Sequence, residues 1–245
     1  MFENIGEIFL LFWRTLLALP FAWRQRRKVF DQFYEIGNAS LLMVCVLSFF
    51  IGAVIALQTG PVLVERSLGN AVGGVVGIAI AKELAPVMMA ILIAGRIGSA
   101  MAAEIGSMRV YSEIDALRTM NINPIHYLVL PRILAIAIAV PMLVVTAILV
   151  GWFGGAVVAN YNQHMEIPFR AFYSDLRDIV ELTDVGNGVF KSFCFALIIG
   201  AVSCHQGLNT IGGPRGIGRS VTKAVVNSIV CIVIFDYVLT RFLLK

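Results

Sequence analysis

The chain has 245 residues, of which 59% are hydrophobic and only 14% are charged, and its formal net charge is +4. Soluble domains are far less apolar than this, so the composition excludes an ordinary soluble protein and predicts an all-α polytopic membrane protein. The excess of positive charge does not indicate nucleic-acid binding, because the lysines and arginines cluster at the ends of apolar runs, where membrane topology explains them.

The first segment, residues 1–35, is interpreted as an interfacial amphipathic helix followed by a basic elbow. Glu3, Glu7 and Arg14 fall on one narrow face of a helix, as in helices that lie in the membrane interface. The basic run that follows marks the cytoplasmic side. An additional short transmembrane helix through residues 8–23 is the alternative.

Residues 36–245 are expected to form a transmembrane bundle. The uncharged runs 36–64 and 133–163 each exceed the roughly 20 residues that a helix needs to cross a bilayer. Gly60-Pro61 is expected to end the first span, and prolines are expected to kink the second and third. The five expected spans are 39–58, 68–108, 131–158, 189–205 and 224–242.

Two charged residues, Lys82 and Glu83, lie about where the middle of the bilayer is expected. A charge there costs on the order of 2.5–3.5 kcal/mol, so the pair should face protein, water or a ligand headgroup. Two interpretations stay open: a self-neutralising pair that holds helices together, and part of the lining of a polar substrate path. Arg96 and Glu104 lie farther along the same span.

Small residues at helical spacing flank this charged pair. Gly69, Gly73 and Gly77 precede the pair, and Gly95 and Ser99 begin a second row that continues to residue 106. Small residues in register let another helix backbone approach closely, so we interpret these rows as packing surfaces.

A short amphipathic helix is predicted over residues 112–120. Ser112 precedes two acidic residues in a capping-box-like arrangement, and Asn123-Pro124 stops the helix. Such a helix between two spans can be an ordinary loop helix, or it can dock into a groove on a cytosolic partner.

The later part of the chain contains two connecting loops of different charge. The loop 160–190 is acidic and predicts an amphipathic helix after Pro168 on the outer surface. The loop 209–223 is basic, contains Arg219 and lacks a phosphate-binding GxxxxGK[ST] motif. In the last span, we expect Asp236 to form a structural ion pair with Arg241 or Lys191.

The distribution of basic residues sets the predicted orientation. With the amino terminus inside and five spans, twelve of the 19 lysines and arginines fall on the cytoplasmic side, six fall outside and Lys82 lies in the membrane. This bias places the 112–120 helix in the cytoplasm. The four cysteines lie in apolar segments without CxxC pairing, so we interpret them as small buried hydrophobic residues.

Several stretches together resemble a known family signature. They are Glu83-Leu84, Pro86-Val87, residues 94–100, residues 103–106, Met108, residues 113–117, residues 216–226 and residues 236–240. These stretches are similar to the MlaE (YrbE) family, the permease subunits of ABC lipid transporters that work with MCE proteins. The likeness covers nearly the whole chain and is weakest over residues 1–35 and 160–188.

The resemblance implies an interfacial amino-terminal helix, five spans and a short cytoplasmic coupling helix in a permease of the bacterial inner membrane, with its amino terminus in the cytoplasm. Such a permease would move phospholipids between the inner and outer membranes and support outer-membrane lipid asymmetry. Implied partners are a second copy in a homodimer, a cytosolic ABC ATPase, a periplasmic ring of MCE-domain proteins and a small STAS-type regulatory subunit. The chain itself would carry no catalytic residue, metal or cofactor, since ATP and Mg²⁺ would belong to the ATPase.

The resemblance also assigns residues to roles. The lipid cavity would include Lys82, Glu83, Arg96 and Glu104. Coupling to the ATPase would use Glu113, Asp115, Leu117, Arg118 and Arg219. Independently of the resemblance, the rows of small residues and the expected ion pair assign structural roles inside the membrane to Gly69, Gly73, Gly77, Gly95, Ser99 and Asp236. At position 82 arginine is also seen in the family, and lysine lacks the bidentate grip of arginine on phosphate.

Two other functions were weighed. A secondary transporter of a lipophilic solute, driven by an ion gradient, could use Glu83 and Asp236 as proton sites, but the 82–118 pattern has no second copy to form an inverted repeat. A membrane scaffold without transport would not explain why costly charged residues lie inside the membrane.

Overall fold

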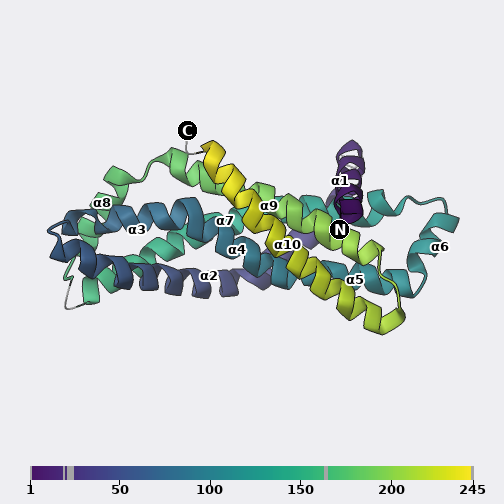
Figure 1. Ribbon diagram of the computed structural model, residues 1–245, viewed down its shortest axis with the longest axis horizontal. Helices are drawn as coiled ribbons and strands as arrows, with labels where there is room; N and C mark the ends of the chain where they lie inside the picture. Colours follow the sequence, from purple (N-terminus) through teal and green to yellow (C-terminus); the bar gives the residue numbers. More distant parts are fainter. Residues whose placement is uncertain (1, 19, 21–24, 163–164, 244–245) are drawn as a thin grey trace. The chain divides into compact units, whose positions relative to one another are not determined.

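The computed structural model describes residues 2–18, 20, 25–162 and 165–243, and all regular structure within these ranges is helical (Figure 1). Five helical segments in these ranges are long and apolar enough to cross a membrane. They are Arg26–Glu65, Gly69–Val110, Ile125–Tyr161, Leu182–Leu208 and Gly213–Leu243. The prediction of an all-α polytopic membrane protein is therefore confirmed.

The elements follow one another with short connections. In chain order they are α1 (Phe2–Leu17), α2 (Arg26–Glu65), η2 (Gly69–Ala71), α3 (Val72–Ala79), η3 (Ile80–Leu84), α4 (Ala85–Ile93), η4 (Ala94–Gly98), α5 (Ser99–Val110), α6 (Glu113–Thr119), η5 (Ile125–Val129), α7 (Leu130–Tyr161), α8 (Phe169–Ile179), α9 (Leu182–Leu208) and α10 (Gly213–Leu243). The element η2 is a 3₁₀ turn, whereas η3, η4 and η5 are π-helical turns.

The chain divides into two compact units, each built from separate stretches of sequence. Unit 1 comprises Met1–Asn38, Ala90–Val140 and Phe193–Lys245, and unit 2 comprises Ala39–Met89 and Pro141–Ser192. The boundaries fall inside α2, α4, α7 and α9, so the chain passes between the units along helices. The expectation of a single permease domain over 1–245 stays a prediction.

Unit 2 is held together where glycines bring backbones close. A side chain at Gly52 would collide with the backbone of Gly151, and one at Gly154 would collide with that of Phe49, so α2 and α7 pack closely. Helix α3 lies along α8, which confirms the amphipathic helix predicted after Pro168 (Figure 1). Glycine is required at such contacts because any Cβ would push the helices apart.

Unit 1 is organised around α5 and its neighbours. Helix α10 packs on α5 and on η4 (Figure 1). Gly98 of η4 lies against Ile199 and Ser203 of α9, and Gly106 of α5 lies against Thr210. The second half of α9 and the loop that follows it are therefore joined to η4 and α5 through small residues.

Several boundaries predicted from sequence were wrong, because of prolines in some cases and of polar residues near the helix ends in others. Helix α2 continues through Pro61 to Glu65, the third span begins at Ile125 instead of residue 131, and the fourth begins at Leu182. A proline removes a single backbone donor, and a long, well-packed helix continues past that loss. Polar residues near the ends of these helices had been read as loop.

One proline in each of the second and third spans follows a π-helical turn, whereas Pro141 lies inside α7 and the kink expected in the third span stays a prediction. The turn η3 precedes Pro86, and η5 precedes Pro131. The N–H of the residue after each turn donates five residues back, from Ala85 to the Ile80 carbonyl and from Leu130 to the Ile125 carbonyl. The kink expected in the second span therefore takes the form of a π-bulge.

The last span also begins earlier than expected. Helix α10 starts at Gly213, with Pro214 in its first turn, where proline is well tolerated. Arg219 thus lies on a helix and not in a loop. Helix α1 is 16 residues long, and its placement in the interface stays a prediction because the structure contains no membrane.

Candidate functional site

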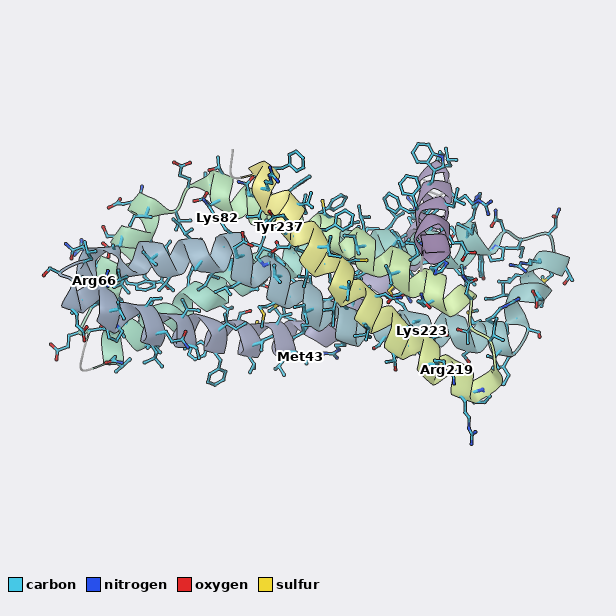
Figure 2. All side chains as sticks on the ribbon, viewed as in Figure 1. Met43, Arg66, Lys82, Arg219, Lys223 and Tyr237 are labelled. Atoms are coloured by element: carbon cyan, nitrogen blue, oxygen red, sulfur yellow. The ribbon has the colours of Figure 1, made fainter. Side chains whose placement is uncertain are left out.

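Four charged side chains meet in unit 2, and we call them the charged cluster: Lys82, Glu83, Asp184 and Lys191. Lys82 and Glu83 come from the π-helical turn η3 (Lys82 is labelled in Figure 2), and the other two come from α9. The Nζ atom of Lys82 lies 2.8 Å from Oδ1 of Asp184. The Nζ atom of Lys191 lies 2.8 Å and 2.9 Å from the two carboxylate oxygens of Glu83.

Local backbone structure explains why these groups meet. Gly188 of α9 lies directly against the backbone carbonyl of Ala81, so the two backbones approach without an intervening side chain. Pro86 has no N–H to donate to the carbonyl of Lys82, four residues earlier. Lys191 instead donates to that carbonyl, with a distance of 3.3 Å from its Nζ atom.

The members of the charged cluster differ in their exposure. The side chains of Lys191 and Asp184 are only 3% and 11% exposed, whereas those of Lys82 and Glu83 are 32% and 41% exposed. Asp184 also accepts a hydrogen bond of 3.2 Å from the N–H of Glu181. The two lysines and two carboxylates balance in formal charge, so their burial is compensated by pairing.

This arrangement corrects one interpretation drawn from the sequence. Lys82 and Glu83 had been considered as a self-neutralising pair, but each forms its ion pair with a residue of α9. Lys191, considered as a partner for Asp236, binds Glu83. The sequence analysis did not connect Asp184 with Lys191, although a spacing of seven residues places them on one face of a helix.

The other two residues expected in a lipid cavity lie in unit 1. Glu104 accepts a hydrogen bond of 2.9 Å from Nη2 of Arg132, which the sequence analysis had not singled out. Arg96 lies in η4 and is half-buried. Asp236 is half-buried on α10. A cavity that contains Lys82, Glu83, Arg96 and Glu104 together stays a prediction.

Helix α6 shows a buried anchor and a charged outer face. Ile114 is fully buried and Leu117 is half-buried, whereas Glu113, Asp115 and Arg118 are exposed. The carboxylate of Asp115 accepts hydrogen bonds of 2.8 Å from Arg109 and 3.3 Å from Arg118. Asp115 therefore has a structural role in the turn between α5 and α6.

The predicted capping box at the start of α6 is wrong. Ser112 occupies the N-cap position, but its φ of 62° lies in the left-handed region and its side chain makes no capping hydrogen bond. An N-cap residue that bonds through its side chain usually has extended backbone angles, which Ser112 lacks. The backbone carbonyl of Ser112 accepts from Ala116 instead.

The small residues named from the sequence have different surroundings. Gly73 and Gly77 lie against α8, and the indole of Trp152 donates to the carbonyl of Gly77 over 3.2 Å. A Cβ at Gly69 would make only an ordinary contact with Val64.

The second row of small residues is corrected by the structure. Gly95 is exposed, and a Cβ there would meet no atom of another residue within 4 Å in the described chain, so it is not a packing contact within this chain. Gly98 takes that place against α9. The hydroxyl of Ser99 donates to the carbonyl of Arg96 over 2.9 Å, within its own helix.

The remaining residues discussed from the sequence are two basic residues of α10, the four cysteines and the side chains that could bind a metal. Arg219 and Lys223 are exposed in the first turns of α10 (Figure 2). The four cysteines are unpaired. In the described ranges, no three His, Cys, Asp or Glu side chains are grouped closely enough to hold a metal ion.

Comparison of the sequence with known proteins identifies a family to which the chain is similar. Residues 29–242 match the family model described as Permease MlaE. A probable ABC transporter permease protein of Synechocystis is 35% identical over 239 residues, which cover 98% of this chain and 90% of that protein. One of Rickettsia typhi is 38% identical over 217 residues, covering 89% of this chain and 83% of that protein.

A plant protein is also similar. The chloroplastic protein TRIGALACTOSYLDIACYLGLYCEROL 1 of Arabidopsis thaliana is 36% identical over 218 residues, which cover 88% of this chain and 61% of the plant protein. The family model and these relatives span both units of the structure and all five candidate membrane spans. The chain therefore belongs to the MlaE permease family.

Proposed function

We propose that this chain is the permease subunit of an ABC transporter that moves phospholipid between the inner and outer membranes of a bacterium. It forms a homodimer in the inner membrane and couples to a separate cytosolic ATPase through α6. The observation that carries the coupling half of this proposal is the build of α6, a helix of 7 residues with fully buried Ile114 beneath an exposed charged face.

A helix of this build transmits force between a partner and the membrane spans. Ile114 ties α6 to the packed interior of unit 1, and the Arg109–Asp115 ion pair of 2.8 Å ties it to the end of α5. Any movement of α6 is therefore passed to α5. Glu113 and Arg118 remain exposed for a partner surface. ATP and Mg²⁺ would be held by that partner.

Support for lipid as the substrate comes from two sources. One relative carries the name of a galactolipid, trigalactosyldiacylglycerol. In unit 2, the side chains of Lys82 and Glu83 remain 32% and 41% exposed while they are paired, so opposite charges are available to a headgroup. A periplasmic ring of MCE-domain proteins and a STAS-type subunit are part of the proposed assembly.

Co-purification tests the coupling half of the proposal. The double variant Glu113→Lys and Asp115→Lys should no longer bring down an ATPase, while the permease remains in the membrane fraction. Because Asp115 also supports the α5–α6 turn, the single variant Glu113→Lys is needed; it should weaken co-purification without loss of fold. Asp178→Lys, on the exposed face of α8, is the matched control. An unchanged yield of ATPase with both variants would refute the coupling role.

Photocrosslinking tests the lipid half independently. A photoreactive amino acid at position 82 or 83 should label copurifying phospholipid more strongly than the same probe at Leu42, which is 79% exposed on an apolar helix. Labelling no stronger than at Leu42 would remove the charged cluster from the substrate path.

A further inference from the structure

A cavity in unit 1 shares no lining residue with the charged cluster. Its volume is about 250 Å³, and its polar lining includes Lys28, Asp31, Tyr127 and Arg132. These residues come from the beginning of α2, from η5 and from the beginning of α7. The uncharged runs of two candidate spans begin at residues 36 and 133, shortly after them. The cavity therefore lies where two spans enter the membrane, at the level of lipid headgroups.

The basic side chains of this cavity have N–H donors that could bind a ligand. The Nη2 atom of Arg132 donates to Glu104, but its Nη1 atom is buried and has no hydrogen-bond acceptor among the described residues. Lys28 lies with its Nζ atom 3.0 Å from the centre of the Tyr127 ring. A buried donor without an acceptor is unfavourable, and an anion bound within reach of the Arg132 guanidinium would satisfy it.

A second cavity adjoins the first and adds positive charge. It has a volume of about 420 Å³, shares Lys28 and Tyr127 with the first, and is also lined by Gln25, Arg26 and Arg27. The side-chain oxygen of Gln25 is buried there without a hydrogen-bond partner among the described residues. Asp31 contributes the one carboxylate among the residues that line the two cavities.

We propose that this cavity binds the headgroup of a phospholipid that carries both a phosphate and a primary amine. Lys28 and Arg132 bind the phosphate, because charge-assisted hydrogen bonds from lysine and arginine suit phosphate oxygens. The carboxylate of Asp31 binds the ammonium group. The volume of about 250 Å³ leaves room for a phosphoethanolamine group, which has eight non-hydrogen atoms.

This site is separate from the proposed substrate path. The charged cluster belongs to unit 2, whereas all residues of the cavity belong to unit 1. A lipid bound here is a resident of the membrane leaflet that holds the start of α2 against η5 and α7. The inference therefore does not depend on what the permease transports.

Binding can be measured by native mass spectrometry of the full-length protein in detergent. The wild type is titrated with phosphatidylethanolamine, phosphatidylglycerol and uncharged diacylglycerol, with inorganic phosphate as a soluble competitor. We expect phosphatidylethanolamine to bind most tightly and diacylglycerol least. Lys28→Gln should weaken phosphatidylethanolamine binding about tenfold, as expected for one lost charged hydrogen bond. Lys223→Gln, an exposed lysine of α10, is the matched control and should change nothing.

A second variant tests the amine. Asp31→Asn should reduce the preference for phosphatidylethanolamine over phosphatidylglycerol by a factor of about three to ten, without weakening phosphatidylglycerol. Thermal unfolding of each variant, with and without lipid, separates lost binding from lost fold. Equal effects of Lys28→Gln and Lys223→Gln would overturn the site. Displacement of lipid by millimolar inorganic phosphate would show a free-phosphate site and overturn the lipid assignment, and unchanged preference in Asp31→Asn would overturn the role of the amine.

Discussion

We predict that substitutions at the two ends of the Glu83–Lys191 ion pair have different effects on stability. Lys191 is almost fully buried, whereas the Glu83 side chain is 41% exposed. Glu83→Gln removes a carboxylate from a buried ammonium group, while Lys191→Met leaves behind a carboxylate that water can reach. The first substitution should therefore be the more destabilising, although glutamine can still accept one hydrogen bond from Lys191 whereas Lys191→Met removes both.

The expected magnitudes follow from this difference in burial. Breaking a fully buried pair costs about 3–5 kcal/mol, and the exposure of Glu83 together with the Lys82 carbonyl, which still accepts from Lys191, reduces this to about 2 kcal/mol for Glu83→Gln. Lys191→Met should cost about 1 kcal/mol, since the remaining carboxylate is partly hydrated and the bond that the Lys82 carbonyl also loses is long, at 3.3 Å, and therefore weak. The double variant should be no less stable than Glu83→Gln alone, because no charge is then left buried without its partner.

Equilibrium unfolding in mixed micelles with increasing SDS, followed by far-UV circular dichroism, gives the required free energies. Glu35→Gln, an exposed glutamate of α2, is the control and should change stability by less than about 0.5 kcal/mol. The reasoning fails if Lys191→Met is more destabilising than Glu83→Gln, or if Glu83→Gln is indistinguishable from the control.

Three further predictions concern other contacts. Gly73→Ala should separate α3 from α8 and cost about 1–3 kcal/mol in the same assay, whereas Gly69→Ala, with room for a Cβ, should be tolerated. Burial, and secondarily a neighbouring aspartate, raise the pKa of Asp175, so the folded state holds that proton more tightly than the unfolded state does. Stability should fall as pH rises from the usual aspartate range through the raised pKa, and Asp175→Asn should flatten this slope and stabilise the protein at pH 7. Glu7→Ala should speed hydrogen exchange in α1 alone, because the Glu7 carboxylate lies 3.0 Å from His205 of α9; no change would show that this contact does not hold α1.

Periodic apolar patterns predicted the elements that depend on local sequence. The five spans, α6 and α8 all have hydrophobic spacing that can be read without knowledge of the rest of the chain. The ends of the spans were harder to predict from the sequence, because packing extends helices through residues such as Pro61 that locally favour a break. Proline was correctly linked to a distortion of the second span, but sequence does not distinguish a kink from a π-helical turn.

The partners of the charged residues could not be predicted for a different reason. Lys191 and Glu83 are 108 residues apart, and the only local signal was the spacing of Asp184 and Lys191 by two helical turns. The same limit applies to Arg132, whose partner Glu104 lies on another helix. Long-range pairing depends on which helices become neighbours, and a single sequence does not contain that information directly.

The charged cluster can serve structure and ligand binding together, because its members divide the two tasks. Pro86 leaves the carbonyl of Lys82 without its usual donor, and in an apolar segment that loss must be compensated. Lys191 compensates it while it also binds Glu83, which explains why a lysine is buried there. The structural task thus falls on the buried residues of α9, and Lys82 and Glu83 keep exposed surface. Pairing across to α9 has thus replaced the self-neutralising pair expected from the sequence, and it stabilises η3 while leaving exposed surface on two opposite charges for the proposed headgroup contact.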